Sequence, residues 1–165
     1  MAVDDPGVVA AFWVLSATTI GGALMVAAVR NLIHAFLFLV LSFIGVAGLY
    51  LTLSADFIAV VQVLIYAGAI AVLMLFAIML TPLAARDNSE TIFLAPAAVL
   101  AGLVATTIAL VAVDTSWPLS DRGPFATTAA ALGEALLDPF VLPFEVASVL
   151  LVVAMIGAIM LVRED

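Results

Sequence analysis

The sequence contains five long runs of apolar residues that are almost free of charge. A helix needs about 20 such residues to cross the hydrocarbon core of a bilayer. Backbone groups cannot stay unpaired in lipid, so runs of this length must be helices. The apolar fraction of 67%, against about 45–50% in soluble domains, excludes a soluble globule of this size. We therefore expect an all-α, polytopic membrane protein with a single transmembrane domain, 1–165. The five predicted transmembrane helices are at about 8–29, 32–53, 57–80, 91–113 and 140–162.

The connections between the runs carry signals for helix starts. Asn31 is predicted to cap the second helix. Ser54 or Asp56 is predicted to cap the third, because such side chains accept hydrogen bonds from first-turn amides. Asp138 stands directly before Pro139, and this pair predicts the start of the fifth helix.

The longest connection, 114–138, is predicted to be an outer loop. Within it, 126–137 is expected to form a short helix, with Leu132 and Leu136 on one face. This helix would lie along the membrane surface. Aromatic residues of the loop, such as Trp117, would then lie near the lipid headgroups.

The arginines predict the orientation of the chain. Arg30, Arg86 and Arg163 fall on one side of the predicted membrane, and Arg122 falls on the other. Because arginine and lysine are enriched on the cytoplasmic side, we expect the N-terminus outside and the C-terminus in the cytoplasm. Acidic residues gather in the outer segments. The net charge of −8 therefore indicates topology rather than a surface that binds a basic partner.

The missing residue types argue against several functions. The chain has no Cys, no Lys and one His, which disfavours a disulfide scaffold, a thiol-ligated metal site and a basic nucleic-acid binder. No nucleotide-binding loop or catalytic triad is present. We expect no catalytic centre, cofactor or metal in this chain, and no direct binding of NADH or nucleic acid. His34 has no second ligand nearby, so we expect it to bond a neighbouring subunit or a lipid headgroup.

Polar residues inside the third run are the first candidates for function. Gln62, Tyr66 and Ala69 are spaced to lie on one face of a helix, with Ala67 and Gly68 as small residues beside them. Small residues let a neighbouring helix approach closely. Two interpretations follow. Gln62 and Tyr66 either hydrogen-bond other helices and hold a bundle together, or they form a polar station for water or protons.

Glu145 is the one acidic residue inside a predicted transmembrane run. Acids within a membrane are costly and are candidates for a functional role by default. Pro143 just before it and Ser148 one turn after it can open or solvate the local backbone. The alternative is a carboxylate near the interface that serves packing.

Three segments of the chain resemble one protein family. The third run, DFIAVVQVLIYAGAIAVLMLFAIML, resembles the signature helix of subunit J of respiratory complex I, whose mitochondrial counterpart is chain 6 of NADH-ubiquinone oxidoreductase. Residues 30–57 resemble the second helix of that family. Residues 132–161 resemble its final helix, with Pro-Phe-Glu and Ala-Ser-Val-Leu-Leu pieces. Many family members carry a glutamate at the position of Gln62.

The resemblance implies a non-redox membrane-arm subunit of a proton-pumping NADH:quinone oxidoreductase in the bacterial inner (plasma) membrane. Its neighbours would be membrane lipid and subunits of the K, A, H and N types. FMN, iron–sulfur clusters and quinone would belong to other subunits. On this resemblance, a conformational change in the third predicted helix, 57–80, would couple quinone reduction to proton translocation.

The resemblance also implies a π-bulge at Tyr66, Ala67, Gly68 and Ala69, where Gly68 would tolerate a distorted backbone. One inserted residue rotates everything beyond it by roughly 100°. Closing the bulge would therefore swing 73–76 against its partner and open a path for water. Tyr66, Gln62 and Glu145 are the candidates for polar groups along a proton path.

Two other functions remain open from the sequence. One is a membrane subunit of a related multi-subunit cation/proton antiporter or membrane-bound hydrogenase, because these share ancestry with the membrane arm. The other is a scaffold that only holds neighbouring helices in place.

Overall fold

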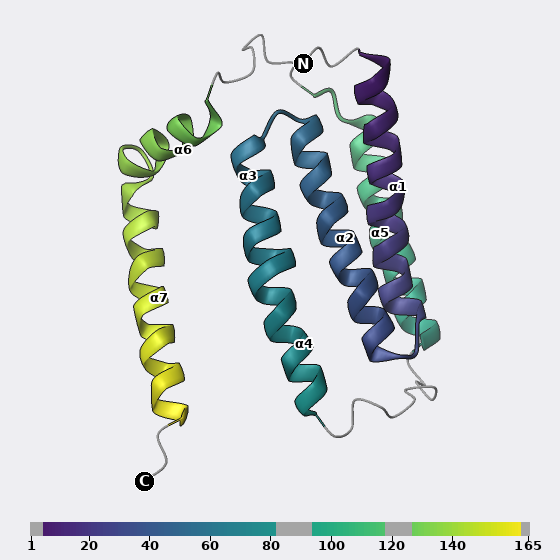
Figure 1. The fold of residues 1–165 in the computed structure, drawn as a ribbon. Coiled ribbons are helices and arrows are strands. Elements are labelled where there is room, and N and C mark those ends of the chain that lie inside the picture. The colour runs from purple at the N-terminus through teal and green to yellow at the C-terminus, as the bar shows by residue number, and fades with distance from the viewer. Residues whose placement is uncertain (1–4, 82–93, 118–126, 163–165) are drawn as a thin grey trace.

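The computed structural model describes residues 5–81, 94–117 and 127–162, which are arranged as helices (Figure 1). Five helical spans are long and apolar enough to cross a membrane. The predicted all-α architecture with five spans is therefore confirmed. Successive spans run in opposite directions, so α1 begins and α7 ends at opposite ends of the molecule (Figure 1). The elements are α1 (Pro6–Ala28), α2 (Leu32–Thr52), α3 (Asp56–Val61), the π-helical η1 (Gln62–Ile70), α4 (Ala71–Leu80), α5 (Leu94–Asp114), α6 (Thr128–Leu137) and α7 (Val141–Val162).

Three of these elements form one continuous span, Asp56–Leu80, which we call helix 3. It consists of α3, η1 and α4. It lies beside α2, which in turn packs against α1. The buried side chains of the described residues all come from α1, α2 and helix 3.

Side-chain caps define the first two helices. The carboxylate of Asp5 accepts a hydrogen bond from the Gly7 N–H of α1 at 3.0 Å. The side-chain oxygen of Asn31 accepts from the N–H groups of Ile33 and His34 of α2, at 2.9 and 3.3 Å. These first-turn amides have no acceptor within their own helix. The predicted cap at Asn31 is thus confirmed.

The start of helix 3 differs from the prediction. The cap position belongs to Ala55, and neither Ser54 nor Asp56 supplies a side-chain cap. The reason is the tight turn after α2. The Ala55 N–H donates to the Tyr50 carbonyl at 2.9 Å, and Ser54 takes a φ of 58° in the left-handed region. Asp56 becomes the first helical residue, where its charge favourably meets the helix dipole.

The predicted short helix of the outer loop is present as α6 (Figure 1). The prediction that Asp138 starts the fifth membrane helix is wrong. Asp138 instead ends α6, since its N–H donates to the Glu134 carbonyl at 3.0 Å. The Phe140 N–H then donates back to Ala135 at 3.0 Å. The residues around Pro139 therefore belong to the turn between the two helices, and α7 begins at Val141.

Small residues bring α1 and α2 together. Gly22 lies so close to α2 that an added Cβ would stand 3.1 Å from the Phe38 carbonyl oxygen. At Gly45 an added Cβ would collide with the Thr19 side chain. The Ser42 hydroxyl donates to the Thr19 carbonyl at 3.1 Å. Close backbone approach and interhelical hydrogen bonds are the usual means of helix association in lipid.

We expect Gly22→Leu to destabilise the folded protein, because the atoms that crowd this position are two backbone atoms of α2 and the Cβ of Ser42, and none of them can move aside without the helix. The expected cost is about 1–3 kcal/mol, as for other overpacked positions. Thermal unfolding of the purified protein in detergent measures it. Gly21→Leu is the matched control, since an added Cβ there meets nothing within 4 Å. Equal melting temperatures for the two variants would contradict this account.

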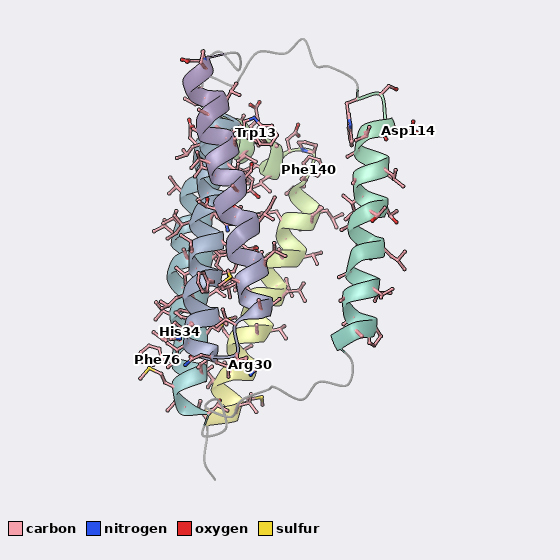
Figure 2. The ribbon with its side chains drawn as sticks, turned by 90° about the vertical axis from the view of Figure 1, so that its right-hand side faces the viewer. Trp13, Arg30, His34, Phe76, Asp114 and Phe140 are labelled. Atoms are coloured by element: carbon pink, nitrogen blue, oxygen red, sulfur yellow. The ribbon has the colours of Figure 1, made fainter. Side chains whose placement is uncertain are left out.

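The remaining helices are only loosely attached to this bundle. Within the described residues, α5 contacts no other element, and α6 contacts only α3 and α7. Figure 2 shows α5 standing apart from the other helices. Every residue of α7 is exposed. These two spans therefore present most of their side chains to whatever surrounds the chain in the membrane.

Candidate functional site in the third membrane helix

The hydrogen-bond register of helix 3 changes along its length. At Gln62 the backbone N–H donates to the Ile58 carbonyl, four residues back, as in an α-helix. At Ala71 the N–H reaches the Tyr66 carbonyl, five residues back. Between them, Gln62–Ile70 is π-helical. The predicted bulge at 66–69 lies inside this segment, which is longer than predicted and begins one turn earlier.

Gly68 is tied to this geometry by a close approach. A Cβ added at Gly68 would stand 3.2 Å from the carbonyl oxygen of Val63, five residues earlier. That separation is tighter than ordinary van der Waals contact. No described glycine has a positive φ, so Gly68 is needed for space rather than for an unusual backbone conformation. A side chain at this position would crowd the acceptor around which the π register is built.

Gln62 is the one buried residue of the π segment, at 8% exposure. Its amide makes no hydrogen bond to any other side chain or carbonyl among the described residues. No side-chain nitrogen or oxygen atom of the described residues is both buried and without a hydrogen-bond partner, so the amide atoms of Gln62 remain accessible. The amide is therefore a natural contact for water or for a polar group of a neighbouring helix.

Tyr66 sits at the edge of the bundle and is 44% exposed. Its ring meets the ring of Phe43 from α2 edge to face, with 5.6 Å between centroids and an interplanar angle of 68°. Such a contact contributes about 0.5–1.5 kcal/mol beyond the burial of area. The sequence does not single out Phe43, because it is one of many apolar residues in its run and carries no polar or spacing signal.

The other candidate residues lie elsewhere. Glu145 is exposed on α7, a helix that packs only against α6 among the described elements. The structure therefore does not bring Glu145 together with Gln62 and Tyr66. His34 is exposed at the start of α2, at the same end of the molecule as Arg30 and Phe76 (Figure 2). Within the described ranges, no three His, Asp or Glu side chains gather as a metal site.

Residues 22–161, which include all of helix 3 and all but the last residue of α7, match the sequence profile of the family NADH-ubiquinone/plastoquinone oxidoreductase chain 6. The chain belongs to this family. The predicted relationship to subunit J and chain 6 is thereby confirmed. This chain 6 protein is a multi-pass membrane subunit of a multi-subunit quinone oxidoreductase complex.

Curated relatives of this chain 6 subunit come from several groups of organisms. NAD(P)H-quinone oxidoreductase chain 6 of Leptolyngbya boryana is 41% identical over 163 residues, covering 95% of this chain and 80% of the relative. F(420)H(2) dehydrogenase subunit J of Methanosarcina mazei is 35% identical over 171 residues, covering 98% and 97%. NADH-quinone oxidoreductase subunit J of Rhodobacter capsulatus is 35% identical over 164 residues, covering 92% and 79%.

Proposed function

We propose that this chain 6 subunit couples quinone reduction by its complex to proton translocation, and that helix 3 is the element that changes conformation. The observation that carries the proposal is the π segment Gln62–Ile70 in the middle of an otherwise α-helical span. π segments are rare and are frequent at functional sites. A helix with one extra residue in its π segment can return to α-helical hydrogen bonding, which gives the helix two states of different register.

A change of register would alter the contacts of α4. Ala71, at its start, is 2% exposed and is the buried residue of that element. Removing the extra residue turns α4 by roughly 100°, which is the rotation of one residue. Ile70 or Val72 would then take the buried place of Ala71. Both are larger and branched, so the packing between α4 and α2 would have to open or shift.

The polar groups near this segment are suited to a water path. The Gln62 amide and the Tyr66 hydroxyl can each donate and accept a hydrogen bond. Neither group carries a net charge, so both serve as relay points rather than as stores of charge. Glu145 could join the same path only through groups of neighbouring subunits, because α7 lies apart from helix 3.

Other subunits supply the neighbouring surfaces and the cofactors of the proposed complex. The described residues of α5 and α7 are exposed, and we propose that subunits of the K, A, H and N types, together with lipid, cover them. We place FMN, iron–sulfur clusters and quinone in other subunits, and the complex in a bacterial plasma membrane. The names of the relatives mention NAD(P)H, F(420)H(2) and NADH. This variety supports a role for chain 6 that does not depend on the electron donor.

The direct test is the register of helix 3 in the assembled complex. We expect the Ala71 N–H to bond the Tyr66 carbonyl in one state and the Ala67 carbonyl, four residues back, in another. High-resolution maps of the complex during turnover and with a quinone-site inhibitor measure this. The proposal fails if Ala71 stays bonded to Tyr66 in every state that the complex visits.

A further inference from the structure

The first turn of helix 3 takes its cap from a distant part of the chain. The N–H of Phe57 has no acceptor within its own helix, and no side chain near Ala55 supplies one. The hydroxyl oxygen of Thr128, the first residue of α6, accepts this hydrogen bond at 3.2 Å. The two residues are 71 positions apart.

This hydrogen bond lies where the two parts of the described chain meet. Within the described residues, α6 contacts α3 on one side and α7 on the other. The joint to α7 is closed by the Phe140 N–H, which donates to the Ala135 carbonyl at 3.0 Å. The chain thus connects the start of helix 3 to α7 through one short helix (Figure 1).

We propose that Thr128 is a positioning residue, which holds the N-terminal part of helix 3 while the π segment changes register. This inference rests on the proposed function. When a helix gains or loses a bulge, one part turns relative to the other, and the held part stays in place. Thr128 and the tight turn before Asp56 hold the N-terminal part. At the other end, the described hydrogen bonds remain local, such as that from the Thr81 hydroxyl to the Ala77 carbonyl at 2.7 Å.

The test compares two neighbouring threonines in the assembled complex. Thr128→Val keeps the shape of the side chain and removes the acceptor. Thr127→Val is the matched control, because the Thr127 side chain caps nothing in α6. Two quantities are measured: amide hydrogen exchange over 57–60, and the ratio of protons pumped to electrons transferred in proteoliposomes.

We expect Thr128→Val to speed exchange at Phe57 by about 2- to 10-fold, the range of one lost hydrogen bond. The proton-to-electron ratio should fall, and Thr128→Ser should restore both quantities. The inference is overturned if Thr128→Val matches Thr127→Val in exchange. It is also overturned if exchange rises while the ratio stays normal, because Thr128 would then be a cap alone. A variant at Gly68 separates the positioning role of Thr128 from the proposed coupling role of helix 3. If the Gly68 variant uncouples pumping and Thr128→Val does not, only the role of Thr128 is lost.

Discussion

Gly68→Ala is expected to shift helix 3 from the π register toward the α register and to uncouple the complex. The added methyl group would stand 3.2 Å from the Val63 carbonyl oxygen in the π state. In an α-helix the same methyl group is unstrained. Crowding destabilises the π state by about 1–3 kcal/mol. This shifts the equilibrium between the two states by about 5-fold or more, since 1.4 kcal/mol is a factor of ten.

The measurements are quinone reductase activity and the proton-to-electron ratio of the assembled complex in proteoliposomes. We expect Gly68→Ala to lower the ratio, and Gly68→Val to lower it further. Gly102→Ala is the matched control, because it makes the same exchange in the membrane helix α5, where an added Cβ meets nothing within 4 Å. If Gly68→Ala and Gly102→Ala both pump normally, the π segment has no part in coupling.

The spans could be predicted from sequence because they depend on local properties. Apolar length and the lack of charge suffice to place five helices. The observed bounds differ from the predicted ones by two residues at most, apart from the start of α5, whose predicted first residues lie outside the described part of the chain. The cap at Asn31 was predictable for the same reason. The starts of helix 3 and α7 were not. They depend on the hydrogen bonds of the turn that joins two helices, as at Ala55 and Asp138. Local composition does not specify which residues of such a turn belong to each helix.

The site was only partly predictable. The π segment followed from a family resemblance, and the close approach of Gly68 to Val63 could be seen only in the folded helix. Phe43 and Thr128 gave no signal, because their roles come from contacts with other helices. The separation of Glu145 from Gln62 was equally invisible. Spacing along a chain says which residues share one helix face, but it does not say which helices pack together.

Gln62→Leu is expected to weaken proton transfer without destabilising the subunit. Gln62 is buried at 8% exposure, and its amide has no hydrogen-bond partner among the described residues. Leucine has a similar size, and the replacement breaks no hydrogen bond within the described residues, so the melting temperature should stay nearly unchanged. If the amide holds a water in a proton path, its loss removes one hydrogen bond from that path. Pumping should then slow by about 2- to 10-fold.

Stability and pumping rate together separate a relay from a packing residue. Thermal unfolding of the complex measures stability, and the rate of proton pumping in proteoliposomes measures proton transfer. Gln62→Glu is the control that keeps a polar group at this position, and we expect it to pump. If Gln62 only held helices together through its amide, replacement by leucine would lower the stability and leave the pumping rate unchanged. That result would remove Gln62 from the path and leave the π segment as the basis of coupling.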